Sequence, residues 1–169
     1  MPTTWRTRPE TELDRDAVRA VNLAAFPTAL EADLVDALRQ DEAWLPGLSW
    51  VAEAADGTVV GYALLTRCRV DDSPALALAP VAVHPDHQRR GVGDAVVRAA
   101  LAAARTRGEP LVLVLGHPEY YPRFGFTPAS ERGIAPTFPV PDEAMMALVL
   151  DEAAPIPSGT IHYPAPFGV

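Results

Sequence analysis

The chain has 169 residues, of which 49% are hydrophobic and 21% charged, a composition typical of a folded globular protein and not of a disordered one. Its formal net charge of −8 argues against nucleic acid as a partner, because proteins that neutralise phosphate backbones are normally basic. All 14 basic residues are arginines, which excludes pyridoxal-phosphate enzymes, phosphate-loop NTPases and protein kinases, since each of these classes needs a lysine.

The length favours a single domain that covers residues 1–169, and the sequence contains no internal repeats. Cys68 is the single cysteine, so an intramolecular disulfide is excluded. The sequence has neither a signal-peptide pattern at its N-terminus nor an apolar run approaching about 18 residues. We therefore expect a cytoplasmic protein with no role in a membrane.

Two helices are expected near the N-terminus. The first lies within residues 10–26 with Thr11 as its N-cap, and its apolar residues recur at helical spacing at Leu13, Ala17, Val21 and Ala24. The second begins at Thr28, and its apolar residues follow the same spacing at Leu30, Leu34 and Leu38. Each pattern predicts a helix that buries one apolar face.

A β-hairpin is predicted next. Strand-like segments at residues 50–54 and 58–65 flank Asp56-Gly57, a pair that favours a two-residue type I′ turn. Another strand is expected over residues 75–83, although Pro80 lacks the N–H group that a sheet ladder needs. We therefore expect this strand to bulge, or to separate from its neighbour, at the proline.

The middle of the chain predicts a helix followed by a buried strand. The proline-free residues 86–109 end at Gly108 and carry apolar residues at helical spacing, at Val92, Val96, Ala99 and Ala103. The five apolar residues 111–115 are typical of a buried parallel strand, which would complete a right-handed crossover with the strand before the helix. Two further strands are expected in the proline-rich last third of the chain, at residues 144–150 and 160–163.

Two glycines, Gly91 and Gly93, stand at the start of this long helix, where each costs about 1 kcal/mol relative to alanine. Bare backbone there lets an anion reach the free N–H groups of the first helical turn, a position that the helix dipole also favours. Arg89 and Arg90 add positive charge within an acidic protein, so the segment predicts a ligand that carries phosphate. The alternative is an ordinary junction of loop and helix with solvated arginines.

Known phosphate motifs narrow the choice of ligand. The dinucleotide fingerprint needs a third glycine where this chain has Val96, and the phosphate-loop motif needs a Gly-Lys pair where Gly93 is followed by Asp94. What remains is Gln-x-x-Gly-x-Gly, beginning at Gln88, directly after a strand broken by proline. This pattern resembles the pyrophosphate loop of the GNAT superfamily of acyl-CoA-dependent N-acetyltransferases. Residues 120–126 are similar to the Tyr-x-x-x-Gly-Phe signature of the same superfamily.

The resemblance covers roughly residues 75–126 and implies both a fold and a ligand. The fold class would be α/β, a mixed and mostly antiparallel sheet flanked by helices, with parallel and splayed fourth and fifth strands. The ligand would be acetyl-CoA, whose pantetheine arm would pair with the main chain of Val81 and Val83, while an N–H group near Val81 and Ala82 would stabilise the oxyanion. The resemblance assigns the rest of CoA binding to Gln88, Arg89, Arg90, Gly91, Val92, Gly93, Asp94 and Arg123.

The resemblance also implies that an amine attacks the thioester of acetyl-CoA directly. The residues agree with this, because the sequence has no Gly-x-Ser-x-Gly elbow and Cys68 fits a small core residue better than a nucleophile. Tyr121 matches the family's general acid, since it stands four positions before Gly125, and Tyr120 is the rival. The alternative for Tyr121 is an aromatic residue that only closes the core.

The group that accepts the proton of the amine is left open. His117 follows the buried strand at the end where ligands of parallel strands gather, and a neutral imidazole suits the task, although a simple turn histidine fits as well. Glu31, near the junction of the first two helices, would attract a cationic amine or simply be solvated. His84, Asp86 and His87 form too small a ligand set for a metal, so no metal is expected.

Two functions from different classes remain after these arguments. The first is an N-acetyltransferase that moves an acetyl group from acetyl-CoA to a primary amine of a small molecule or peptide. The second is a non-catalytic acyl-CoA sensor, which would use the same phosphate loop. The negative net charge favours a cationic acceptor, whose identity the sequence does not specify, and a homodimer is left open.

Overall fold

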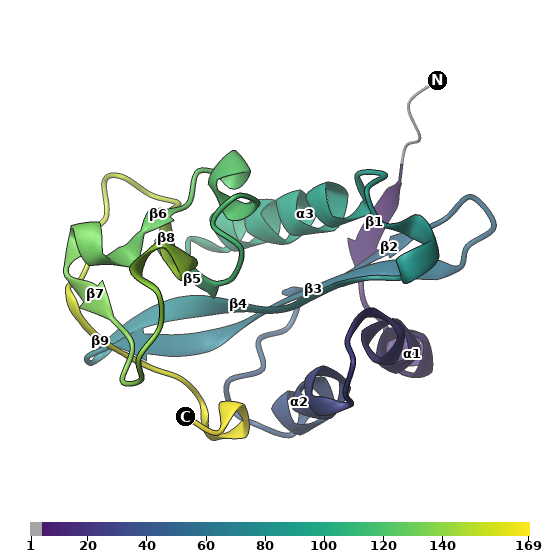
Figure 1. Ribbon diagram of the computed structural model, residues 1–169, viewed down its shortest axis with the longest axis horizontal. Coiled ribbons are helices and arrows are strands. Elements are labelled where there is room, and N and C mark those ends of the chain that lie inside the picture. The colour runs from purple at the N-terminus through teal and green to yellow at the C-terminus, as the bar shows by residue number, and fades with distance from the viewer. Residues whose placement is uncertain (1–4) are drawn as a thin grey trace.

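The computed structural model describes residues 5–169, in which α3 covers one face of a nine-stranded sheet and α1 and α2 cover the other (Figure 1). The helices are α1 (Arg15–Ala25), α2 (Leu30–Arg39) and α3 (Val92–Arg107). The strands are β1 (Arg6–Pro9), β2 (Ser49–Glu53), β3 (Val59–Val70), β4 (Ser73–Val83), β5 (Leu111–Leu115), β6 (Thr127–Pro128), β7 (Ile134–Ala135), β8 (Met145–Val149) and β9 (Gly159–His162).

The strands follow the order β1-β2-β3-β4-β5-β8-β6, and β9 pairs with the far end of β3 and with β7. All pairs are antiparallel except β4 with β5 and β7 with β9. This confirms the predicted fold class and the strands expected at residues 144–150 and 160–163. The short strands β1, β6 and β7 were not predicted, because two to four residues are too few to display an alternating pattern.

The predicted central helix is confirmed, but it begins at Val92 and not near residue 86. A short 3₁₀ turn occupies residues 85–87, and the left-handed backbone of Gly91 (φ +86°) precedes the first helical residue. Gly108 ends the helix with φ +88°, as expected. The side chains that α3 buries against the sheet are Val92, Val96, Val97, Ala100, Leu101 and Ala104, so Ala99 and Ala103 are only partly buried.

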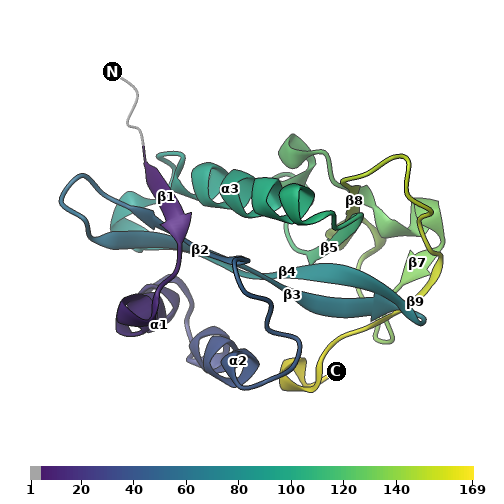
Figure 2. The ribbon, with the colours of Figure 1, turned by 180° about the vertical axis from the view of Figure 1, so that it is seen from behind.

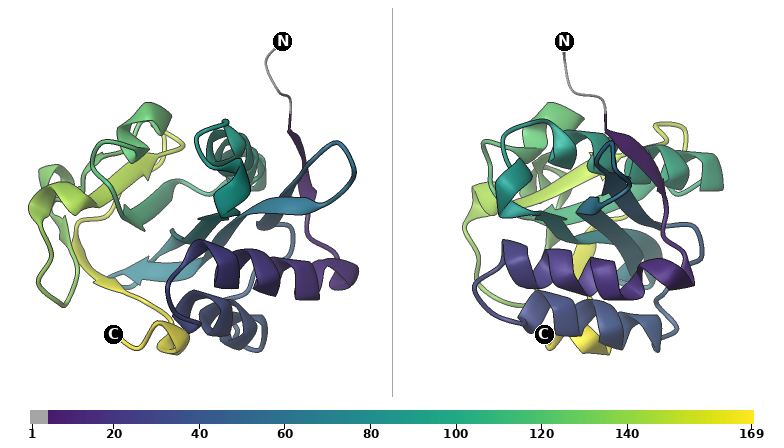
Figure 3. Two further views of the ribbon diagram at one scale, coloured as in Figure 1. Left: turned by 45° about the vertical axis from the view of Figure 1, so that its right-hand side comes forward. Right: turned by 90° about the vertical axis from the view of Figure 1, so that its right-hand side faces the viewer.

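The two N-terminal helices lie side by side (Figure 3), and each buries only part of its predicted apolar face, since Val21 and Leu38 are buried as expected. Leu13 is 94% exposed because it lies in the short 3₁₀ turn before α1, which begins at Arg15. In this turn the Asp14 carboxylate accepts hydrogen bonds from the N–H and hydroxyl groups of Thr11 and from the Arg8 guanidinium. Leu30 is 73% exposed. The buried faces consist of Val18, Val21 and Asn22 in α1 and of Ala32, Val35 and Leu38 in α2, while Ala24 is exposed.

The hairpin of β2 and β3 is confirmed, but the type I′ turn is wrong. The Ala54 N–H donates to the Thr58 carbonyl (2.8 Å), and the Gly57 N–H donates to the Ala54 carbonyl (2.9 Å). In this loop Gly57 has positive φ (+87°) and Asp56 does not, whereas a type I′ turn requires positive φ at both central residues. The connection is therefore a three-residue loop that ends in a left-handed glycine.

The predicted irregularity in β4 takes both of the expected forms. Ala63 of β3 faces Val81 while Leu65 faces Leu78, so β4 holds one extra residue next to Pro80. Within the described residues, β4 pairs with β5 only through Leu76↔Val112 and Ala77↔Leu113. Beyond Ala77 the two parallel strands separate, which opens a gap in the sheet.

Candidate functional site

A cleft of about 810 Å³ opens beside this gap. Its walls come from the end of α1, from β4, from the loop before α3 and from the segment that follows β5. Most of the residues predicted for the site line this one cavity, namely Val81, Val83, Gln88, Arg89, Gly91, Val92, Gly93, Asp94, His117, Tyr121 and Arg123. The predicted residues Glu31, Ala82 and Arg90 lie outside its lining, whereas Ala25, Phe26 and Tyr120 join it.

The loop before α3 has the backbone shape of an anion-binding segment. Arg89 (φ +63°) and Gly91 (φ +86°) both adopt the left-handed conformation, which turns the chain sharply into the helix. Gly91 is the N-cap and has no side chain to cap the first turn, so the N–H groups of Val92, Gly93 and Asp94 remain available to a ligand. A helix N-terminus of this kind attracts phosphate through its dipole and its free donors.

Two contacts fix the position of this loop. The Trp5 indole N–H donates to the Arg90 carbonyl (2.8 Å), and the Gln88 side-chain amide donates to the Val83 carbonyl (3.3 Å). Arg89 and Arg90 are exposed, and neither forms an ion pair within residues 5–169. The contact of Trp5 had no sequence signal, because it joins residues 85 positions apart.

The edge of β4 leaves main-chain groups unpaired in the gap. The His84 N–H donates to the Val60 carbonyl of β3, and successive N–H groups of a strand point to opposite sides. The N–H of Ala82 therefore points toward β3, while the N–H groups of Val81 and Val83 and the C=O group of Val81 point into the gap, and the Val83 carbonyl accepts the Gln88 hydrogen bond. This geometry favours Val81 over Ala82 as the donor to an oxyanion, and the Ala82 side chain packs on the α1 side of the sheet.

The Tyr121 ring packs among aromatic side chains beside the gap. It stands edge-on to Phe126, with ring centroids 5.9 Å apart, and it lies so close to Gly116 that any larger residue there would collide with the ring. Partial burial raises the pKa of the Tyr121 phenol to about 12. The hydroxyl therefore keeps its proton at neutral pH and can give it to a stronger base.

Tyr120, by contrast, is held in a closed cluster. Its hydroxyl donates to the Asp94 carboxylate (3.0 Å), and Arg123 both stacks on its ring (4.2 Å from the centroid) and pairs with Asp94 (3.2 Å). Burial, followed by the charge of Asp94, raises the pKa of the Tyr120 phenol. Because its proton is engaged by Asp94, Tyr120 is less suited than Tyr121 to release it. A Cβ atom at Gly93 would lie 2.6 Å from the Tyr120 hydroxyl, so a larger residue there would displace this hydroxyl.

The two residues predicted for the amine side lie in different places. His117 is exposed at the carboxyl end of β5 and lines the cleft, and its carbonyl accepts hydrogen bonds from the N–H groups of Tyr120 (3.1 Å) and Tyr121 (3.3 Å). Glu31 lies half-buried in the first turn of α2, outside the cleft. The structure thus brings His117, but not Glu31, to the same cavity as Tyr121.

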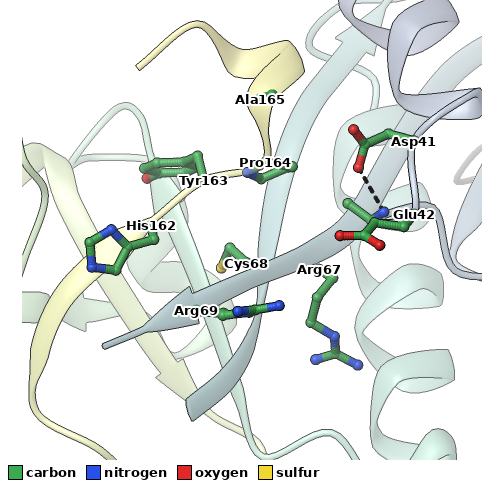
Figure 4. Close-up of a pocket in the computed structure, with 10 residues that line it drawn as sticks. Asp41, Glu42, Arg67, Cys68, Arg69, His162, Tyr163, Pro164 and Ala165 are labelled. Atoms are coloured by element: carbon green, nitrogen blue, oxygen red, sulfur yellow. Dashed lines mark hydrogen bonds between the residues drawn. The ribbon is translucent and has the colours of Figure 1, made fainter. Parts of the chain in front are cut away.

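A second hollow, of about 450 Å³, lies at the far end of β3 and is lined by charges of both signs (Figure 4). Its basic side includes Arg67, whose guanidinium donates two hydrogen bonds of 2.8 Å to Glu109. Cys68 is buried in this wall, and burial raises the pKa of its thiol to about 12, which keeps it protonated. This hollow is lined by none of the residues predicted for the site, all of which the structure describes.

No group of three or more His, Cys, Asp or Glu side chains in residues 5–169 is arranged to hold a metal ion. In the same residues, no helix is long and apolar enough to cross a membrane.

Comparison with known proteins gave consistent matches. The model of the acetyltransferase (GNAT) family matches residues 15–126. The uncharacterized N-acetyltransferase YjhQ of Escherichia coli is 42% identical over 135 residues, which cover 77% of this chain and 74% of that protein. The uncharacterized N-acetyltransferase YhbS of Escherichia coli is 30% identical over 159 residues, which cover 92% of this chain and 94% of that protein.

Two crystal structures share the fold over nearly the whole chain. The structure of YhbS in complex with CoA aligns with a TM-score of 0.89 at 25% identity and covers 99% of this chain and 93% of that one. A GNAT family acetyltransferase from Brucella melitensis in complex with acetyl-CoA aligns with a TM-score of 0.79 at 28% identity, covering 98% of this chain and 99% of that one.

Proposed function

Because the chain belongs to the GNAT acetyltransferase family, we propose that it transfers the acetyl group of acetyl-CoA to a primary amine of a small molecule or peptide. The crystal structures of similar proteins with CoA and acetyl-CoA support this choice of co-substrate. The proposal treats residues 1–169 as one catalytic domain and assigns it to the cytoplasm, where CoA thioesters are available.

One observation carries the proposal. A single cleft combines the open N–H groups at the start of α3, the unpaired main-chain edge of β4 and the protonated Tyr121 hydroxyl. The first suits a pyrophosphate, the second suits the amides of a pantetheine arm, and the third suits a leaving thiolate. Acetyl-CoA carries all three chemical groups along one flexible chain.

The binding steps follow from the positions of these groups. The first-turn N–H groups of α3, together with the exposed Arg89, bind the pyrophosphate. The N–H groups of Val81 and Val83 and the C=O group of Val81 pair with the pantetheine amides, as an added strand would pair with a sheet edge. The thioester is thereby brought to the gap between β4 and β5, beside Tyr121.

The chemistry is a direct acyl transfer. The amine nitrogen forms a bond with the thioester carbonyl carbon, and the carbonyl oxygen becomes an oxyanion that accepts a hydrogen bond from the Val81 N–H. The carbon–sulfur bond then breaks, and the Tyr121 hydroxyl gives its proton to the sulfur, so that CoA leaves as the thiol. The nitrogen loses one proton, either to His117 or to water, and the amide is the second product.

Two measurements on the same protein test this proposal. Calorimetric titration is expected to show binding of acetyl-CoA, and incubation with a panel of amines is expected to release the CoA thiol only when an acceptor is present. Absence of acetyl-CoA binding would contradict the whole proposal. Binding without thiol release by any amine, amino acid or peptide would contradict catalysis and identify the chain as an acyl-CoA sensor.

A further inference from the structure

A third cavity, of about 310 Å³, lies on the face of the sheet opposite α3. We call it the apolar pocket, and it is lined mainly by Leu34, Ala79, Leu115, Phe138, Tyr163 and Phe167. These residues come from α2, β4, β5 and segments of the last third of the chain. Figure 2 shows the last of these segments, in yellow, beside α2 below the sheet. The lining exposes mostly carbon atoms, which suits an apolar group and offers little to a charged one.

The apolar pocket and the cleft that would hold acetyl-CoA both reach the gap between β4 and β5. Pairing of β4 with β5 ends at Ala77 and Leu113, so Ala79 and Leu115 flank the opening. Side chains alternate across a strand, and Leu115 therefore shares the face of Leu113, away from α3. A group held in the apolar pocket lies next to the point where the thioester would be presented.

Apolar side chains are exposed at this opening. Leu115 is 45% exposed although the preceding Val114 is only 2% exposed, and the half-buried Leu34 and Phe138 line the same concavity. Large apolar side chains that share an exposed concavity gain free energy when an apolar ligand covers them. The volume is at the lower end of the range for small-molecule pockets, about 300–1,000 Å³, which suits a branched or aromatic side group.

We propose that the apolar pocket binds the apolar side group of the acceptor amine, an inference that rests on the proposed acetyl transfer. In that proposal the pyrophosphate binds at the start of α3, on the other face of the sheet from the pocket, so an amine held in the pocket meets the thioester from the side away from the phosphate loop. The walls of the pocket belong to α2 and to the segments around Phe138 and Phe167, none of which contributes to the phosphate loop. The acceptor class is therefore a primary amine next to a branched aliphatic or aromatic group.

Acetylation of two matched amides tests this substrate class. L-Phenylalaninamide and glycinamide present similar α-amines and differ in the side group, so their kcat/KM ratio isolates the apolar contact. We expect a ratio of about 10 to 100 in favour of phenylalaninamide, which is the usual discrimination from burying a few carbon groups. Equal values for the two amides would overturn the inference without affecting acetyl-CoA binding, which the calorimetric titration measures separately.

Substitution of a pocket residue localises the effect. Leu115→Gln places a polar side chain at the rim of the pocket. An apolar side group that enters the pocket would then strip water from the glutamine side chain, which costs free energy. We therefore expect the kcat/KM ratio of phenylalaninamide to glycinamide to fall toward one. The matched control is Leu13→Gln, which changes a leucine that is 94% exposed and outside the pocket, and which should leave the ratio as in the parent. Equal ratios in Leu115→Gln and the parent would overturn the inference.

Binding without turnover gives an independent readout. In the protein alone, titration with phenylalaninamide is expected to shift the ¹³C-methyl signals of Leu34 and Leu115 and not those of Leu13. This experiment decides the question by itself if neither amide is acetylated, and an absence of shifts at Leu34 and Leu115 would overturn the inference.

Two other occupants of the pocket have distinct signatures, and either would overturn the inference. If the pocket holds a longer acyl chain, hexanoyl-CoA shifts the same methyl signals without an amine and is a better donor than acetyl-CoA. If it holds a second copy of the chain, light scattering shows a dimer that Leu115→Gln dissociates.

Discussion

The two cavities that meet at the gap between β4 and β5 are built in different ways. The cleft around the start of α3 uses main-chain groups of β4 and of the loop before α3, left-handed glycine and arginine torsions, and the Tyr121 hydroxyl. The apolar pocket on the other side uses only the shapes of side chains from several separate segments. Main-chain recognition depends on backbone shape, which short motifs specify, whereas a pocket of side chains depends on how distant segments pack.

The two cavities are therefore expected to respond differently to substitution. Changes in the cleft are expected to affect catalysis and acetyl-CoA binding for every acceptor. Changes in the apolar pocket are expected to affect the choice of acceptor. A cleft substitution that changed only the choice of acceptor, or a pocket substitution that weakened acetyl-CoA binding, would contradict this division.

The largest expected effect on the cleft side is that of Tyr121→Phe. This change removes the hydroxyl that protonates the leaving thiolate and keeps the ring that packs against Phe126. We expect kcat to fall about 10²- to 10⁴-fold for all acceptors, with little change in acetyl-CoA affinity. Steady-state thiol release and calorimetric titration of acetyl-CoA measure the two quantities.

Tyr120→Phe is the matched control, since it removes a hydroxyl that is already bound to Asp94. Its effect on kcat is expected to be less than about 10-fold, because the general acid is still present. Parental turnover in Tyr121→Phe, under conditions where the chemical step limits the rate, would reduce Tyr121 to a packing residue.

The next effect is a loss of acetyl-CoA affinity in Gly91→Val. A β-branched residue strongly disfavours φ +86°, so the loop must change its shape and withdraw donors from the pyrophosphate. We expect an affinity about 10- to 100-fold lower, a loss of about 1–3 kcal/mol. Gly57→Val is the control, because Gly57 has φ +87° and open space around it but lies in the hairpin turn. Equal losses of affinity in the two variants would point to general destabilisation and contradict the loop assignment.

A smaller effect is expected from the exposed charge beside the loop. Arg89→Gln removes a cation that lines the cleft, and it should weaken acetyl-CoA binding a few-fold at low salt and less at about 0.5 M salt, where screening is strong. Arg105→Gln, which changes an exposed arginine near the other end of α3, should leave the affinity as in the parent. A loss that is independent of salt would contradict an electrostatic role for Arg89.

The smallest effect concerns the pH dependence of stability. Burial raises the pKa of Tyr121 from 10.0 to about 12, so the folded protein holds this proton more tightly than the unfolded chain does. The resulting stabilisation is complete below pH 10 and is lost as the pH rises to about 12. Urea unfolding across this range should show a shallower decline in the free energy of unfolding for Tyr121→Phe than for the parent. Identical declines would contradict the raised pKa.

Much of the fold followed from the sequence where local signals were strong. Proline-free windows, Gly108 and the apolar run at residues 111–115 predicted the central helix and β5 correctly. The predicted faces of α1 and α2 were only partly right, because Leu13 lies before α1, in the turn whose Asp14 pairs with Arg8 of β1, and Leu30 is exposed. A contact between a strand and a later turn leaves no periodic trace in the sequence.

The candidate site shows the same division. The glycine pair and the Tyr-x-x-x-Gly-Phe segment located most of the cleft, because each acts through its own backbone or side chain. The sequence did not indicate that Trp5 anchors the loop, that Gly116 makes room for Tyr121, or that Glu31 lies outside the cleft. These relations join residues that meet only in the folded chain.

The central claim is that the main chain of the cleft binds acetyl-CoA, and backbone amide NMR tests it most directly. On titration with acetyl-CoA, we expect large shifts for the N–H signals of Val81, Val83 and the first turn of α3, with little change at Arg67 and Arg69 in the hollow at the far end of β3. Shifts concentrated at Arg67 and Arg69, with the first turn of α3 unchanged, would contradict the account.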